Sequence, residues 1–302
     1  MRKIQALCCG LLVLSGLIWL RPRKPEKTFS AAAKSEQISE PPAAPVSEQS
    51  ITYQTYDLGS ATVYVVSVPV GIPISVAVAD ELTTVAAFAR RENALAVLNG
   101  GFFDPQNGKT TSYLTAQGQP TGNPANNERL TGNPTLAPYL NQIFNRSEFR
   151  AYRCESSASL RYDITQHDAP LPDSCQLESA LGAGPQLLPE NTAATEAFTD
   201  YDKGELIRDA IGSVQPNARS AIALQPDGTV RLLMVAQRPN APGMTLADLA
   251  EFATSLGATQ LLNLDGGSSS SLYYNGQTYL GRLDTDGNLV ERPVKSVILV
   301  GQ

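Results

Sequence analysis

The sequence predicts an α+β fold, in which a strand-rich mixed-sheet core carries a few packed helices. Runs of β-branched residues recur along the chain and are separated by proline and glycine, which is typical of short strands. The segment 246–256 has apolar residues at helical spacing and ends at Gly257. Hydrophobic residues make up 42% of the 302 residues and charged residues 17%, an ordinary globular composition.

The first 50 residues are predicted to lie outside that core. Residues 1–20 have a basic start followed by an apolar run, the pattern of a signal peptide or an N-terminal membrane anchor. Residues 21–50 are rich in Pro, Ser, Ala and Glu and predict a disordered linker. We therefore expect an exported, extracytoplasmic protein that is periplasmic, envelope-bound or secreted, with its folded domain over 51–302. Membrane contact is expected only through the N-terminal apolar segment.

The charge balance of residues 51–302 argues against a nucleic-acid partner. Of the 23 basic and 29 acidic residues in the chain, seven and four lie in the first 50. The remaining 16 and 25 give a net charge near −9, whereas proteins that bind nucleic acid present a basic footprint to its phosphates. We therefore expect no nucleic-acid partner.

Two cysteines, Cys154 and Cys175, fall within the predicted domain, and no CxxC pattern is present. In an exported protein such a pair is expected to form a disulfide bond, and a loop of this length would contribute about 3 kcal/mol in the chain-entropy model. Metal binding by thiolates is not expected. Free thiols in a reducing compartment are the alternative.

The elements of the domain can be predicted in chain order from periodicity and from turn signals. Strand runs, two helical segments and one irregular segment alternate along the chain. The expected elements are strands at 61–68 and 74–79, a short helix at 83–94, a strand at 95–103, an irregular excursion at 105–150, a strand at 180–188, a hairpin at 218–237 turning at Asp227-Gly228, the helix at 246–256, a strand at 259–265 and a last strand at 294–302.

The stretch NLDGGSSSSLYYNG places a carboxylate, that of Asp265, at the end of a predicted buried strand. Asp265 is followed by Gly266 and Gly267, which tolerate positive φ and let a ligand approach the backbone closely. Ser268 and Ser269 add hydroxyl groups and backbone amides that could cradle an anion. The alternative is a plain Asp-Gly turn at the end of a strand.

Three other positions share features with this strand end. Asn99 ends an apolar strand and is followed by Gly100 and Gly101, and Gly184 lies in a corner of small residues. Arg219 enters a strand that otherwise reads as buried, so its charge needs a carboxylate or a phosphate as a partner. The alternatives are tight turns for the glycines and an exposed strand end for the arginine.

The chain contains one histidine, His167, so zinc sites built from several histidines are excluded. A serine–histidine–aspartate triad is an alternative, although no GxSxG elbow is present and a solvated loop suits His167 better. Oxygen atoms of Asp265 and Asn99 could instead bind a structural cation such as Ca²⁺. We expect no other metal or cofactor.

The chain contains five segments in the order found in the phosphodiester glycosidases: LAVLNGGFFDP, ALGAGPQLL, ARSAIAL, GMTLADLAEFATSLGATQLLNLDGGSSSSLYYNG and RPVKSVILV. On these segments residues 51–302 resemble that family, and the helix with its NLDGG block is the most specific part. Ser268 stands where the family commonly has a third glycine, and Ser220 stands where it usually has threonine. Both departures keep a small or hydroxyl-bearing side chain.

The resemblance implies an exported hydrolase that cleaves a sugar-1-phosphodiester bond in a glycan or envelope-type substrate, with the strand-rich region as its single catalytic domain. Asp265 would act as base or as stabiliser of the cationic sugar ring, Arg219 would neutralise the phosphate, and Asn99 would bind a sugar hydroxyl. A second carboxylate, if the reaction needs one, would be Asp104 or Glu178. The alternative function is a non-catalytic glycan-binding module at the cell envelope.

The three catalytic candidates are far apart in the sequence, yet each lies at the end of an expected strand. We therefore predict that they meet in one pocket at the rim of a sheet, where Arg219 would balance the charge of Asp265. The substrate-binding wall is expected to comprise Gly100, Gly101, Gly184, Gly266, Gly267, Ser268 and Ser269.

Overall fold

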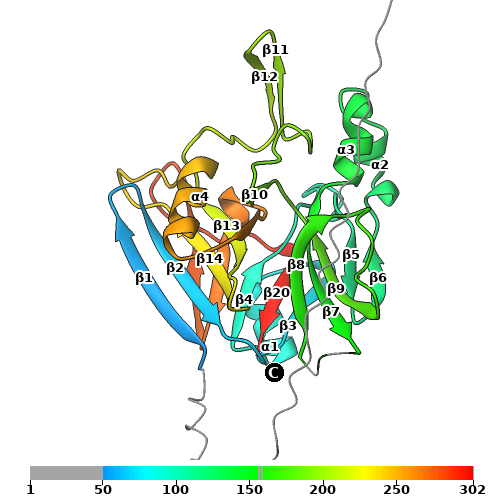
Figure 1. The fold of residues 1–302 in the computed structure, drawn as a ribbon. Helices are drawn as coiled ribbons and strands as arrows, with labels where there is room; N and C mark the ends of the chain where they lie inside the picture. The colour runs from blue at the N-terminus through cyan, green and yellow to red at the C-terminus, as the bar shows by residue number, and fades with distance from the viewer. Residues whose placement is uncertain (1–49, 156, 158, 302) are drawn as a thin grey trace, which may run out of the picture. The chain divides into compact units, whose positions relative to one another are not determined.

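The computed structural model describes residues 50–301, apart from 156 and 158. These residues belong to one compact unit that spans Glu48–Gln302 (Figure 1). The predicted signal or anchor segment and almost all of the predicted linker lie outside the described residues. Over the part of the chain that is described, no helix has the length and apolarity needed to cross a membrane.

Three antiparallel sheets form the domain, and the first contains the β13–β14 hairpin predicted at Asp227-Gly228. Gly228 has φ of +83° at that turn, a left-handed conformation that favours glycine. In spatial order, this first sheet consists of β1 (Thr52–Leu58), β2 (Ala61–Val68), β14 (Val230–Ala236), β13 (Arg219–Leu224), β15 (Gln260–Asn263) and β10 (Gln186–Leu188).

The other two sheets have five strands each, and two further hairpins complete the strand content of the described residues. The second sheet consists of β17 (Gln277–Leu280), β16 (Ser271–Tyr274), β4 (Ala96–Asn99), β20 (Val294–Val300) and β3 (Ile74–Thr83). The third consists of β6 (Gln119–Gly122), β5 (Leu114–Ala116), β9 (Cys175–Gly182), β7 (Ser147–Cys154) and β8 (Arg161–Gln166). The hairpins are β11 (Thr199–Asp202) with β12 (Glu205–Asp209), and β18 (Arg282–Leu283) with β19 (Leu289–Val290).

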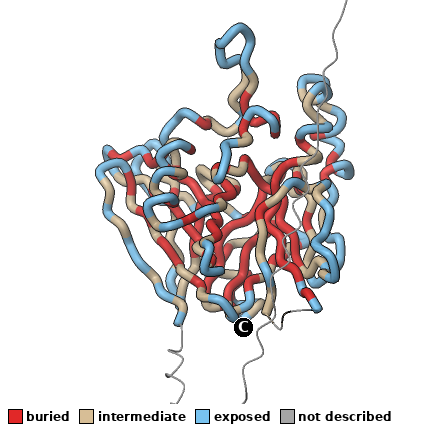
Figure 2. Tube along the Cα trace, in the orientation of Figure 1, coloured by how far each residue is buried: buried red, intermediate tan, exposed pale blue. Residues whose placement is uncertain are grey.

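The hydrophobic core lies between the sheets and on two outer faces. Its largest cluster joins inward side chains from all three sheets, such as Leu98, Leu181 and Leu232. A second cluster packs the outer face of the first sheet against Leu249 of α4 (Leu246–Ser255), and a third packs the second sheet against Phe88 of α1 (Val85–Glu92). Figure 2 shows the buried segments concentrated in the central strands.

The α+β class predicted from the sequence is confirmed. The predicted mixed sheet is not found, because every pairing between the described strands is antiparallel. Strands joined by a tight turn, such as β1 with β2 and β13 with β14, can pair only in the antiparallel sense. The predicted helix at 246–256 is confirmed as α4. Thr245 and Asp248 form a capping box at its start, and Gly257 follows its C-cap with φ of +89°.

The irregular excursion predicted at 105–150 contains more regular structure than expected. It includes β5, β6, the first residues of β7, η1 (Pro124–Asn126), α2 (Glu128–Thr131), η2 (Ala137–Tyr139) and α3 (Leu140–Phe144). The asparagines that indicated loops are in part helix caps. Asn123 accepts a hydrogen bond from the amide of Ala125, and Asn127 accepts one from the amide of Arg129.

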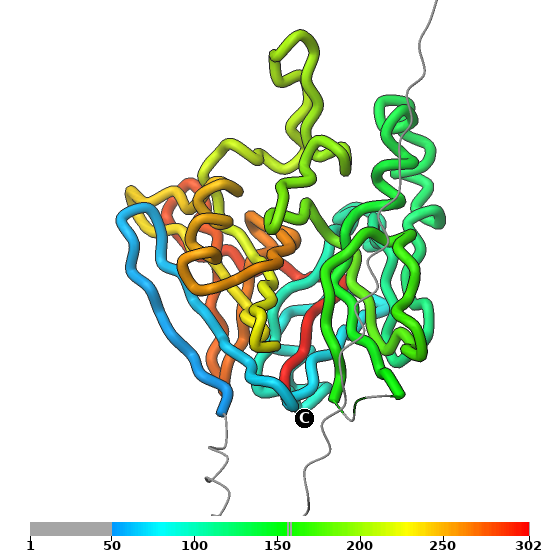
Figure 3. Tube along the Cα trace, in the orientation of Figure 1, coloured from blue at the N-terminus to red at the C-terminus, as the bar shows by residue number. Residues whose placement is uncertain are grey.

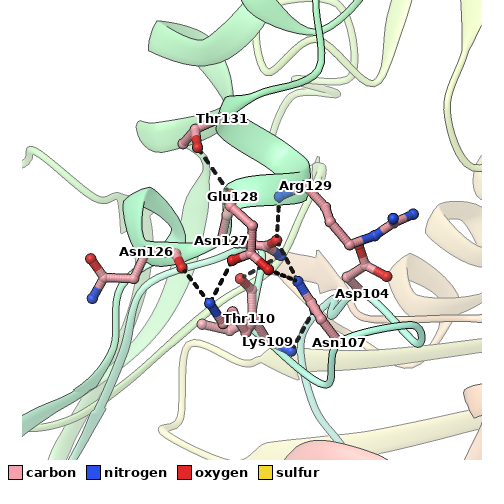
Figure 4. A network of polar contacts seen from close by, with 9 residues as sticks. All are labelled: Asp104, Asn107, Lys109, Thr110, Asn126, Asn127, Glu128, Arg129 and Thr131. Atoms are coloured by element: carbon pink, nitrogen blue, oxygen red, sulfur yellow. Dashed lines mark hydrogen bonds and ion pairs between the residues drawn. The ribbon is translucent and has the colours of Figure 1, made fainter.

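A polar network fixes the start of this excursion against α2 (Figure 4). The Lys109 ammonium lies 2.5 Å from the Glu128 carboxylate, and Arg129 Nε lies 2.7 Å from Asp104 Oδ2. Asn107 Nδ2 donates to the side-chain oxygen of Asn127 at 3.0 Å. These contacts hold the segment that directly follows β4 and the Asn99-Gly100-Gly101 turn.

The β11–β12 hairpin projects from the rest of the domain (Figure 3). It is held through Tyr139, whose hydroxyl donates to Asp200 Oδ2 at 2.7 Å while the guanidinium carbon of Arg208 lies 4.8 Å from the centre of its ring. The hairpin leads directly into Ala210 and Ile211. The projecting hairpin and the η2 segment are therefore joined by polar contacts.

The disulfide bond predicted between Cys154 and Cys175 is present. The two residues are directly opposite each other in the pairing of β7 with β9, and the bond closes a chain segment with a sequence separation of 21. That segment contains β8, the edge strand of the third sheet.

Replacing both Cys154 and Cys175 by alanine is expected to lower the free energy of unfolding by about 3 kcal/mol, because the unfolded chain regains the entropy of a closed loop. Urea denaturation of the oxidised full-length protein measures the change, and the Cys8→Ser/Cys9→Ser variant serves as the control because those cysteines lie outside the domain. An unfolding free energy that neither the double substitution nor a reductant changes would show that this bond does not stabilise the fold.

Candidate active site

Asp265 and Arg219 line the same cavity, which has a volume of about 420 Å³. Its wall is formed by the chain around the starts of β13 and η3 (Gly267–Ser269), the end of β15, the segment after β12 and Phe102 after β4. The predicted convergence of distant strand ends therefore holds for these two residues.

The backbone at Asp265, just beyond β15, is held by hydrogen bonds to β13 of the first sheet and to the turn after β4 of the second. The amide of Asp265 donates to Gly100 O at 3.1 Å, and the amide of Leu264 donates to Ser220 O at 2.8 Å. These bonds place the Asp265 side chain. Burial raises the pKa of Asp265 to about 6, and the Ser269 hydroxyl, the Arg292 charge and the Gly266 amide oppose that rise. A carboxyl group with such a pKa can exchange a proton near neutral pH.

Asn99 lies behind the cavity wall rather than in it, contrary to the predicted contact with a sugar hydroxyl. The residue has no exposed surface. Its Nδ2 donates to the backbone oxygen of Asp265 at 2.7 Å, and its Oδ1 accepts from Ser220 Oγ at 2.6 Å and from Ser271 N at 3.1 Å. Asn99 is therefore a positioning residue for Asp265.

Arg219 is held by the backbone instead of by a carboxylate. Its Nε donates to Met244 O at 3.1 Å, and its two Nη atoms donate to Ile211, Gly212 and Gln215 carbonyls at 3.1, 2.5 and 2.8 Å. Burial lowers its pKa to about 10, an effect opposed by Asp209, so the guanidinium stays charged at neutral pH. No ion pair with Asp265 is found among the described residues, and the predicted charge balance is not seen.

Three predicted substrate-binding glycines face protein atoms. A Cβ on Gly100 would lie 2.6 Å from Ser296 Oγ, and one on Gly101 would lie 2.2 Å from Gly182 O. Gly184 is similarly enclosed, because a Cβ there would lie 2.3 Å from Glu196 Oε2. These glycines permit close packing of neighbouring segments, and none of the three is among the residues that line the cavity.

The second glycine pair does reach the cavity, which is lined by Gly266, Gly267 and Ser268. Ser269 is buried beside the Asp265 carboxylate. The backbone amides predicted to cradle an anion are mostly engaged, because the Gly267 amide donates to Ala218 O at 2.8 Å and the Ser269 amide to Gly266 O at 3.2 Å. The φ of Gly267 is +60°, the left-handed conformation predicted for this turn.

Two arginines and one asparagine belong to the site and were not predicted from the sequence. Arg292 Nη1 donates to Ser268 Oγ at 2.9 Å, and its charge acts on Asp265. Arg282 and Asn217 line the cavity, and Arg282 Nη1 donates to Asn217 Oδ1 at 2.6 Å. The arginine in RPVKSVILV and the asparagine two positions before Arg219 were the available signals.

The other carboxylate and histidine candidates lie outside this cavity. Asp104 is paired with Arg129, and Glu178 on β9 is paired with Arg153 at 3.2 Å. His167 Nδ1 lies 2.9 Å from Glu148 Oε2, and its ring stacks on Tyr113 with the ring centres 3.7 Å apart. None of the three predicted candidates lines the cavity that contains Asp265.

A cation held jointly by Asp265 and Asn99 does not fit this geometry. The side-chain oxygen of Asn99 already accepts two hydrogen bonds, from Ser220 and Ser271. Over the described ranges, no three His, Cys, Asp or Glu side chains come together in a way that could hold a metal ion.

A family model described as phosphodiester glycosidase matches residues 92–301, which include every residue placed in the site above. The chain belongs to the phosphodiester glycosidase family. The family resemblance read from the sequence is thereby confirmed. A comparison with curated protein sequences found no match.

Solved structures share the fold of this phosphodiester glycosidase family member. The catalytic domain of zebrafish N-acetylglucosamine-1-phosphodiester alpha-N-acetylglucosaminidase, auto-inhibited by its pro-peptide, matches with a TM-score of 0.59 and 17% identity over 86% of this chain and 85% of that one. A hypothetical protein from Synechocystis matches with a TM-score of 0.52 and 17% identity. The match covers 83% of this chain and 61% of the Synechocystis chain.

Replacing Asp265 by asparagine is expected to stabilise this family member above pH 6. Folding raises the pKa of Asp265 from about 4 to about 6, so the contribution of this group to wild-type stability is fully present below pH 4 and is lost as the pH rises through 6. Asparagine does not titrate, so the stability advantage of the variant should grow between pH 4 and 6. Urea denaturation across that range measures it. The exposed Asp286→Asn variant is the control, and a pH-independent difference for Asp265→Asn would contradict the prediction.

Replacing Arg219 by methionine is expected to lower the free energy of unfolding by at least about 3 kcal/mol, because four carbonyl groups lose their charged donor. Arg219→Lys keeps the charge and should recover part of the loss. Denaturant unfolding measures both variants. Loss of activity with unchanged stability would instead indicate that Arg219 acts directly on the substrate.

Proposed function

We propose that this protein hydrolyses a sugar-1-phosphodiester, cleaving the bond between the anomeric carbon and the phosphate oxygen. The observation that carries the proposal is the composition of the cavity wall. Asp265 is the one carboxylate among the described residues that line it, and its pKa is raised to about 6. Family membership supports the same reaction class.

A single carboxylate suits a phosphodiester better than an ordinary glycoside. Most glycosidases use two carboxyl groups, one of which protonates the departing oxygen. A phosphate monoester leaves as a weakly basic anion, so protonation of the departing oxygen contributes little to the rate. The reaction then requires a general base that deprotonates the attacking water and positively charged groups that stabilise the phosphate.

In the proposed reaction Asp265 is the general base. A water molecule attacks the anomeric carbon while Asp265 accepts its proton, and the carbon–oxygen bond to phosphate breaks with its electron pair leaving on the phosphate oxygen. The products are a free sugar and a phosphate monoester. A base with a pKa near 6 is ionised at neutral pH and still accepts a proton effectively.

The sugar has suitable partners in the same wall. Asn263 is 1% exposed and lines the cavity, and its Nδ2 donates to Gly184 O at 2.8 Å. Its Oδ1 is buried and accepts no hydrogen bond from the described residues, so a small shift of the wall would let a sugar hydroxyl donate to this unsatisfied acceptor. Phe102 lines the same cavity and offers it an apolar surface.

The cellular setting remains part of the proposal. The basic and apolar pattern of residues 1–20 supports export, and a disulfide bond suits an oxidising compartment outside the cytoplasm. A glycan or a sugar phosphate of the cell envelope is accordingly the proposed substrate. A non-catalytic glycan-binding role is the alternative that the activity assay decides.

The full-length protein is expected to release free sugar from methyl sugar-1-phosphate diesters, tested over several hexoses and N-acetylhexosamines, and not from the matching methyl glycosides. Asp265→Asn should lower kcat about a hundredfold or more with little change in KM. The value of kcat/KM should rise as the pH increases through about 6, because the base must be ionised. Release of reducing sugar and of methyl phosphate measures the reaction.

Asp286→Asn is the control for this assay, because it removes an exposed carboxylate at a turn outside the cavity. Unchanged turnover in Asp265→Asn would exclude its role as the base. A wild-type protein that binds these diesters without cleaving any of them would favour the glycan-binding alternative.

A further inference from the structure

The donors that the sequence offered for a phosphate are largely engaged within the protein. Arg219 donates four hydrogen bonds to carbonyl oxygens, which leaves one of its five N–H groups. The Gly267 and Ser269 amides donate to Ala218 O and Gly266 O. These groups therefore leave few donors for a phosphate in this cavity.

Arg282 also lines the cavity, and most of its N–H groups have no hydrogen-bond acceptor among the described residues. Its one hydrogen bond among the described residues runs from Nη1 to Asn217 Oδ1 at 2.6 Å, and no carboxylate of the described region forms an ion pair with it. Four N–H groups thus remain on a charged, half-buried side chain in a cavity. A bidentate anion is the ligand that such a fork fits best.

Asn217 and Ser268 turn further donors toward the same cavity. The side-chain oxygen of Asn217 accepts from Arg282 and from the amide of Ala218, so its Nδ2 remains as a donor beside Gly267. Ser268 Oγ accepts from Arg292 Nη1 at 2.9 Å, which leaves the hydroxyl hydrogen of Ser268 free to donate elsewhere. Both residues line the cavity with Arg282.

We propose that Arg282, together with the Asn217 amide and the Ser268 hydroxyl, forms the anion subsite that binds the substrate phosphate. The subsite makes Arg282 a specificity-determining residue, because it favours a phosphodiester over an uncharged aglycone. The inference rests on the proposed function for the identity of the substrate. Its anion-binding part can be tested without any reaction.

The first experiment measures binding of inorganic phosphate to the full-length protein by calorimetry. Arg282→Gln should weaken binding roughly 10- to 100-fold, the range for hydrogen bonds to charged groups. Arg282→Lys should recover part of the affinity, because it keeps the charge and loses the planar fork. Asn217→Asp, which keeps the acceptor for Arg282 and replaces the amide donor by a carboxylate, should also weaken binding. Arg161→Gln on the exposed start of β8 is the matched control.

The second experiment compares kinetics on methyl sugar-1-phosphate diesters. Arg282→Gln should raise KM roughly 10- to 100-fold, and its thermal unfolding temperature should stay that of the wild type, because the side chain is half-buried and makes one hydrogen bond. A structural role for Arg282 would lower the unfolding temperature as well.

The binding experiment tests the anion subsite independently of the proposed hydrolysis. Phosphate binding that depends on Arg282 supports the subsite even if no diester is cleaved, and in that case the proposed hydrolysis alone fails. Phosphate binding that is absent, or equal in wild type, Arg282→Gln and Arg161→Gln, overturns the subsite even if diesters are cleaved.

Discussion

The site depends on one buried amide group, that of Asn99, which joins two sheets at the point where both end. Asn99 closes β4 of the second sheet, and its three hydrogen bonds reach Asp265 O, Ser220 Oγ and Ser271 N. Ser220 belongs to the first sheet, and Ser271 begins β16 of the second. Because a buried amide must satisfy both its donor and its acceptor, no other short side chain makes this set of contacts equally well. The position of the Asp265 backbone is thereby fixed by groups that lie far apart in the sequence.

The paired glycines serve this arrangement by removing side chains where backbones must approach. Gly101 stands so close to Gly182 of the third sheet that a Cβ would lie 2.2 Å from its carbonyl oxygen, and Gly100 is similarly pressed against Ser296. The second pair behaves differently, since Gly266 and Gly267 are exposed to the cavity and shape its wall. The same dipeptide thus permits sheet packing in one place and ligand access in the other. Periodicity cannot distinguish these two uses.

The sequence was sufficient for the α+β class, for α4 and for the presence of Asp265 and Arg219 in one cavity, because these follow from local pattern and from strand ends. It was insufficient for the roles of Asn99 and Arg219, since those depend on which atoms surround each side chain after packing. Arg219 was predicted to seek a negative partner, yet four carbonyl dipoles satisfy it instead. Arg282 escaped prediction because its two-residue strand, β18, carries no periodic signal and reaches the cavity only through tertiary contacts.

The charge distribution of the domain suits the proposed substrate through both its net charge and the charges inside the cavity. Residues 51–302 carry a net charge near −9, so a polyanion is repelled over distances of about a Debye length, roughly 10 Å at 0.1 M salt. Inside the cavity, Arg219 and Arg282 line the wall with a single carboxylate, and Arg292 acts on that carboxylate from behind Ser268. A ligand with one negative charge on a neutral polar body meets little long-range repulsion and a strong short-range attraction. A sugar joined to a phosphodiester has that distribution of charge, whereas a nucleic acid or an uncharged glycan does not.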